Sequence, residues 1–99
     1  MLRQESIEML KTYFSNKPVI KAYIFGSYSR NEENEKSDID IILEIDYSVP
    51  VSLLDLISWK LELEKQLKAK VDIVSEDGMS KYIKPLIEKD KLLIYERAA

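Results

Sequence analysis

The stretch Asp38-Ile39-Asp40-Ile41-Ile42-Leu43-Glu44-Ile45 decides the fold, because it alternates in the way of a strand with one buried face. Side chains on a strand point to opposite faces in turn, so Asp38 and Asp40 share one face. The other face is apolar and is expected to pack on helices; it carries Ile39, Ile41, Leu43 and Ile45.

The two aspartates of this strand are the first candidate site. They lie roughly 6 to 7 Å apart along the strand, and each disfavours the ionised form of the other unless a cation lies between them. A hard divalent ion with oxygen ligands meets that need. A solvated pair of acids at the start of a strand has the same pattern, so Asp38 and Asp40 alone do not establish a site.

The stretch Val71-Asp72-Ile73-Val74 repeats the pattern in a second strand. Val71 and Ile73 mark the core face, and Asp72 points the other way, although aspartate is a poor strand former. If the two strands are neighbours, three carboxylates converge on one patch, which favours a site over an ordinary exposed residue.

Gly26-Ser27 follows a short β-rich stretch and precedes a polar segment that we expect to begin with a helical turn. Glycine lets a phosphate approach the backbone closely, and a helix N-terminus offers free N–H groups to it. A simple strand-to-helix turn has the same sequence, so the pair gains meaning only beside the aspartates.

The remaining pattern predicts a mixed α/β (α+β) fold in one domain over 1–99, with a small mixed sheet of about four strands and helices packed on one face. Helices are expected over 2–14, 52–69 and 79–89, the last kinked or split by Pro85. Strands are expected over 19–25, 38–45, 71–75 and 92–96. Ser52-x-x-Asp55 has the form of a capping box. The pattern leaves open whether the last strand joins the sheet edge.

Composition narrows the chemistry. The chain has 99 residues, a net charge of -3, no Cys and no His, so thiolate, imidazole and zinc–sulfur chemistry are excluded. The acidic balance argues against a stable nucleic-acid partner. No apolar run of about eighteen residues and no signal-peptide pattern is present, so a cytoplasmic protein without a membrane partner is expected.

Together, Gly26-Ser27 and Asp38-x-Asp40, ten residues further on, resemble the signature of the DNA polymerase beta-like nucleotidyltransferase superfamily. The stretches 25–41, 51–56 and 70–74 and the region 85–95 are similar to the minimal nucleotidyltransferases in particular. Family members usually read Ala-Arg-Gly where this chain has Ser29-Arg30-Asn31, and asparagine tolerates the left-handed conformation that a glycine would adopt.

The resemblance implies roles for individual residues. Gly26 and Ser27 would hold the triphosphate of ATP, and Arg30 either approaches a phosphate or is a solvated helix residue. Asp38, Asp40 and Asp72 would bind two Mg²⁺ ions, with Asp72 helping to activate the attacking hydroxyl in an in-line transfer that releases pyrophosphate.

The resemblance also implies a partner. Minimal nucleotidyltransferases are commonly the antitoxin of a module whose toxin is a HEPN-domain RNase, and the implied reaction transfers AMP to a toxin tyrosine. One alternative is an idle enzyme that neutralises its toxin by binding alone. Another is transfer to a small molecule, although so short a chain has no evident second domain to enclose one. A template-dependent polymerase would need more chain and a more basic surface.

The long helix over 52–69 has two apolar flanks, with Lys60 and Glu64 between them at a spacing that favours an ion pair. Leu54, Ile57 and Leu61 form one flank; Leu56, Trp59, Leu63 and Leu67 form the other. A sheet normally covers one flank, so we expect the flank with Trp59 to meet a partner, either the toxin or a second copy in a homo-oligomer. The alternative is that the terminal helices cover both flanks.

Overall fold

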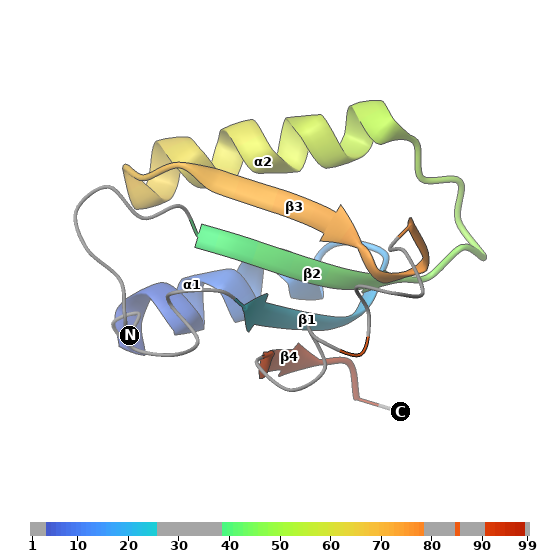
Figure 1. Cartoon of the computed structure of the whole chain (residues 1–99), viewed down its shortest axis with the longest axis horizontal. Helices are drawn as coiled ribbons and strands as arrows, with labels where there is room; N and C mark the ends of the chain where they lie inside the picture. The colour runs from blue at the N-terminus through green and yellow to red at the C-terminus, as the bar shows by residue number, and fades with distance from the viewer. Residues whose placement is uncertain (1–3, 26–38, 79–84, 86–90, 99) are drawn as a thin grey trace.

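A computed structural model describes residues 4–25, 39–78, 85 and 91–98 of the chain. Its elements follow the predicted order closely (Figure 1). They are α1 (Gln4–Ser15), β1 (Val19–Phe25), β2 (Ile39–Ile45), α2 (Leu53–Leu67), β3 (Val71–Ser75), the 3-10 helix η1 (Glu76–Gly78) and β4 (Leu92–Glu96). Three strands, β1, β3 and β4, have the predicted bounds.

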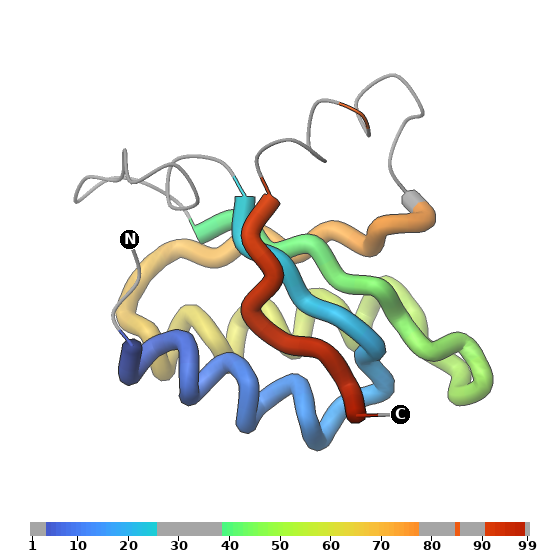
Figure 2. Tube along the Cα trace, turned by 90° about the horizontal axis from the view of Figure 1, so that it is seen from below, coloured from blue at the N-terminus to red at the C-terminus, as the bar shows by residue number. Residues whose placement is uncertain are grey.

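The four strands form one mixed sheet in the order β3-β2-β1-β4. Strand β1 is antiparallel to β2 and to β4, whereas β2 and β3 are parallel and joined through α2. The last strand therefore does join the sheet, as an edge strand beside β1. Both helices lie on the same side of the sheet (Figure 2), which confirms the predicted α+β arrangement.

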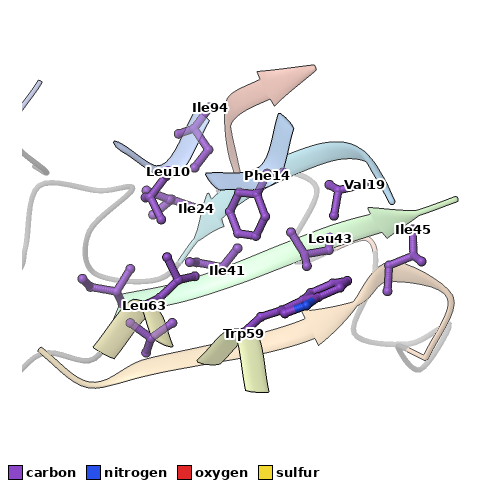
Figure 3. Packing of buried hydrophobic residues seen from close by; sticks show 13 residues of the cluster. Leu10, Phe14, Val19, Ile24, Ile41, Leu43, Ile45, Trp59, Leu63 and Ile94 are labelled. Atoms are coloured by element: carbon purple, nitrogen blue, oxygen red, sulfur yellow. The ribbon is translucent and has the colours of Figure 1, made fainter. Parts of the chain in front are cut away.

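The core lies between this face of the sheet and the two helices. Helix α1 packs over β1 and β4, and α2 packs along β3. Figure 3 shows Phe14 of α1 and Trp59 of α2 on the two sides of Leu43, a fully buried residue at the centre of β2. The odd-numbered apolar residues of β2 are all buried, so the alternation read from the sequence holds.

Helix α2 begins and ends at residues that satisfy its free backbone groups. The Ser52 hydroxyl accepts a hydrogen bond from the Asp55 N–H, and the Asp55 carboxylate accepts one from the Ser52 N–H, which forms the predicted capping box. At the other end Lys68 adopts the left-handed conformation with φ of 54°, and its N–H donates to the Glu64 carbonyl. The helix therefore ends two residues earlier than predicted.

The flank of α2 that packs on the sheet is the one that the sequence analysis expected to be free for a partner. Trp59 is only 7% exposed and Leu63 is fully buried, so this flank faces the sheet and does not form a surface for a partner. The other flank is open to solvent, with Leu54 76% exposed and Leu61 58% exposed. The prediction that the flank with Trp59 meets a partner is therefore wrong, because Trp59 and Leu63 both belong to the hydrophobic core.

Two predicted segments lie outside the described residues: the helical turn expected within 28–37, and most of the helix expected over 79–89. In the second segment only Pro85 is described, and it is helical. Across the described ranges, none of the helices is long and apolar enough to cross a bilayer.

Candidate active site on the sheet face opposite the helices

Asp40 lies near the start of β2 on the face opposite the helices. Its neighbours Ile39 and Ile41 are buried in the core, so strand alternation turns Asp40 away from it. Asp40 is half-buried. Ile42, two residues along β2 and on the same face, is fully buried and gives this part of the face an apolar floor.

Asp72 lies directly beside Asp40. The pairing of β2 with β3 matches Asp40 to Asp72, as it matches Ile39 to Val71 and Ile41 to Ile73. Paired positions in neighbouring strands lie about 4.8 Å apart and point to the same face. Asp72 is exposed, whereas Asp40 is flanked on both sides. The two strands are therefore neighbours, as the prediction required, and Asp40 and Asp72 stand at paired positions; their role as a shared site stays a prediction.

A row of three side chains crosses the sheet at this level. Strand β1 matches Phe25 to Asp40, so the row reads Phe25, Asp40, Asp72 from the middle of the sheet to its edge. Phe25 is half-buried. Because it follows from the pairing register between two strands, the place of Phe25 beside Asp40 had no signal in the sequence.

The starts of β2 and β3 are tied together at this end. The Ile39 N–H, directly before Asp40, donates to the carbonyl of Lys70, two residues before Asp72, at 2.9 Å. The Glu64 carboxylate of α2 accepts a hydrogen bond from the Val71 N–H at 3.0 Å. The sequence indicated that Glu64 pairs with Lys60, and the two are 3.0 Å apart, but it gave no sign of this second contact.

Four predicted site residues lie outside the described residues: Gly26, Ser27, Arg30 and Asp38. Two of them are next in the chain to the ends of paired strands, since Gly26 follows Phe25 and Asp38 precedes Ile39. Their part in the site therefore stays a prediction.

The described half of the site fits a hard divalent cation. Mg²⁺ takes oxygen ligands and is commonly held by one or two carboxylates together with substrate phosphates. Asp40 and Asp72 supply two carboxylates on paired positions. Within the described ranges, no group of three acidic side chains forms a metal cage, and the third predicted ligand, Asp38, is outside those ranges.

A separate hollow at the far end of β2 does not suit a nucleotide. It has a volume of about 330 Å³, and its lining is acidic. The Tyr47 hydroxyl donates to the Asp77 carboxylate at 2.9 Å, and burial together with this hydrogen bond raises the pKa of Tyr47. A triphosphate would be repelled by these carboxylates. The lining residues are Glu44, Ile45, Tyr47, Glu76 and Asp77.

Comparison with known proteins identifies the family of the chain. The family model described as "Polymerase beta, Nucleotidyltransferase" matches residues 8–99. A protein of Methanocaldococcus jannaschii, whose assignment as a protein adenylyltransferase is itself a prediction, is 41% identical over 95% of this chain and 91% of its own length. Protein adenylyltransferase MntA of Thermococcus cleftensis is 30% identical over 95% of this chain and 98% of its own length.

A solved structure shares the fold at lower identity. It is the tri-AMPylated HEPN toxin of Shewanella oneidensis in complex with its MNT antitoxin, and the match has a TM-score of 0.73. The identity is 17%, and the alignment covers 97% of this chain and 74% of that one. Because the family model matches nearly the whole length of the chain, the chain belongs to the polymerase beta family of nucleotidyltransferases.

Proposed function

We propose that this nucleotidyltransferase moves AMP from ATP to a protein hydroxyl, a tyrosine of a cognate HEPN-family RNase toxin, and so acts as an antitoxin in the cytoplasm. The observation that carries the proposal is the pairing of Asp40 with Asp72 at the open end of the sheet. The relatives named as protein adenylyltransferases support the reaction class, and the toxin–antitoxin complex that shares the fold supports the partner.

In this proposal Gly26, Ser27 and Arg30 hold the triphosphate beside the ends of β1 and β2. Asp38, Asp40 and Asp72 hold two Mg²⁺ ions, which would neutralise charge on the phosphates and lower the pKa of the acceptor hydroxyl. The acceptor oxygen forms a bond to the α-phosphorus, and the bond from that phosphorus to the pyrophosphate oxygen breaks. Asp72 is the more open carboxylate and receives the hydroxyl proton.

The test follows label from α-labelled ATP to a co-expressed HEPN toxin in the presence of Mg²⁺. We expect Asp40→Asn and Asp72→Asn each to lower the rate by about 100-fold or more, since several kcal/mol of charge stabilisation are lost and each 1.4 kcal/mol is tenfold. Asp77→Asn is the matched control, because it removes an exposed carboxylate beyond the other end of β3.

Three outcomes would count against the proposal or its site assignment. If the wild type binds the toxin and leaves it unlabelled, the protein neutralises by contact alone. If label appears on a small molecule and not on protein, the acceptor class is wrong. Equal rates for Asp77→Asn and the two site variants would remove the assignment of Asp40 and Asp72.

A further inference from the structure

Glu64 occupies an unusual place at the free edge of the sheet. Among the described strands β3 is the outermost, with β2 as its one neighbour. Between two parallel strands, every second residue of a strand forms hydrogen bonds to its neighbour strand. The residues in between point their N–H groups away from that neighbour. Lys70 bonds to β2 through its carbonyl, so the Val71 N–H faces the open edge. The Glu64 carboxylate takes the position of a missing fifth strand there and accepts that N–H at 3.0 Å.

The same carboxylate is held by a second contact. Lys60, one turn earlier in α2, donates from its ammonium to Glu64 at 3.0 Å. Glu64 is also the residue whose carbonyl accepts the N–H of Lys68, where the helix ends. One residue therefore connects the end of α2, through both its backbone and its side chain, to the first residue of β3. The Val71 hydrogen bond and then the Lys60 hydrogen bond lower the pKa of Glu64, so the carboxylate stays ionised.

The contact between Glu64 and Val71 matters because Asp72 directly follows Val71 in the chain. Asp72 is the second residue of β3, a five-residue edge strand that begins at Val71. Local opening of the strand at Val71 would therefore also displace Asp72. We propose that Glu64 is a positioning residue for the active site, which keeps Asp72 in register with Asp40 by fixing the Val71 N–H at the sheet edge. This inference rests on the proposed function, in which Asp40 and Asp72 share a divalent cation.

The experiment compares Glu64→Ala, which removes the acceptor, with Glu64→Gln, which keeps an oxygen for the Val71 N–H. The control is Glu62→Ala in the same helix, because Glu62 also accepts one long-range hydrogen bond, from the Tyr13 hydroxyl at 2.8 Å, but on the side of α1. The readouts are Mn²⁺ affinity by titration and amide hydrogen exchange at Val71 and Asp72 in the free protein.

We expect Glu64→Ala to weaken Mn²⁺ binding by about tenfold, the low end of what loss of an outer partner of a metal ligand costs, because Glu64 acts on Asp72 through Val71. Exchange at Val71 should accelerate in the same variant. Glu64→Gln should recover most of both properties, and Glu62→Ala should keep wild-type values. Wild-type Mn²⁺ affinity in Glu64→Ala, or an equal loss in Glu62→Ala, would overturn the inference.

The two proposals fail in different ways. Mn²⁺ binding and hydrogen exchange are measured without an acceptor protein. Lack of label transfer by the wild type therefore removes the proposed reaction and leaves the role of Glu64 standing. Normal label transfer together with unchanged Mn²⁺ affinity in Glu64→Ala removes only the role of Glu64.

Discussion

Asp40 and Asp72 are paired in register yet differ in surroundings. Asp40 is half-buried between Phe25 and Asp72, while Asp72 is exposed and has a strand on one side only. In the proposed reaction the acceptor hydroxyl would therefore reach Asp72 more freely than Asp40. Asp40 has less space for any change in side-chain length.

This difference predicts unequal tolerance of a longer carboxylate. Asp72→Glu adds one methylene at an open edge, whereas Asp40→Glu adds it between two neighbours, where overpacking costs about 1–3 kcal/mol. We expect Asp40→Glu to be the slower variant by about tenfold in AMP transfer, the equivalent of about 1.4 kcal/mol. The measurement is kcat/KM for both variants with the toxin as acceptor, and a slower Asp72→Glu would contradict the argument.

For single residues, the sequence predicts where the carboxylates of Asp40 and Asp72 lie, but not which residues contact or position them. Strand alternation places Asp40 and Asp72 on the face away from the core, and the neighbouring strands bring them together. Phe25 and Glu64 could not be predicted in the same way. The place of Phe25 depends on a register between β1 and β2, and that of Glu64 on which edge of the sheet lies open.

Helix α2 shows how an element can be predicted correctly and oriented wrongly. Its capping box, its i,i+4 ion pair and its two apolar flanks all follow from the sequence. Periodicity cannot say which of two similar apolar flanks faces the sheet, because both have helical spacing. The choice is made by packing, which places Trp59 and Leu63 inward.

The orientation of α2 has a direct test in stability. Trp59→Ala should lower the free energy of unfolding by about 3–5 kcal/mol, because it opens a cavity in the core. Leu54→Ala, on the exposed flank, should change it by no more than about 0.5 kcal/mol. Urea unfolding followed by circular dichroism measures both. Comparable losses in the two variants would mean that the exposed flank is covered in solution.

At the scale of the whole molecule, an ion pair between described residues connects the ends of two strands that are not neighbours. The Arg97 guanidinium, just after β4, donates to the Asp46 carboxylate, just after β2, at 2.7 Å. Strand β1 lies between β2 and β4, and the N–H groups of Asp46 and Arg97 donate to the carbonyls of Pro18 and Ile20. This cluster closes the end of the sheet remote from the candidate site.

The cluster predicts a loss of stability in acid. Hydrogen bonds from Ser48 and then Arg97 hold the pKa of Asp46 well below its usual range. A carboxyl with a lowered folded-state pKa contributes its full stability above the ordinary value of about 4, and loses it as pH falls through the folded value. The advantage of wild type over Asp46→Asn in free energy of unfolding should therefore be constant above about pH 5 and shrink below about pH 4.

Unfolding titrations over this pH range check the prediction, with Arg97→Gln as the second variant. Arg97→Gln removes one of the groups that lower the pKa of Asp46 but keeps the carboxylate. It should therefore reduce the part of the free energy of unfolding that is lost in acid. A difference between wild type and Asp46→Asn that does not vary with pH would show that the cluster has no part in acid stability.

The topology of the molecule is the part that the sequence predicts least. Helices and strands follow from local spacing, but the order β3-β2-β1-β4 depends on pairings between segments far apart in the chain. Strand β4 illustrates this, since Leu92–Glu96 has the residues of a strand but nothing local to assign β1 as its neighbour.

Because Trp59 is buried, its intrinsic fluorescence reports on the packing of the core. It is the only tryptophan, and it lies in the core between α2 and the sheet, on the face away from the aspartates. Indole emission moves to longer wavelength when the ring meets water, so intrinsic fluorescence follows core packing without a label. A nucleotide bound on the opposite face would leave that emission nearly unchanged, so one fluorescence measurement would distinguish unfolding from ligand binding.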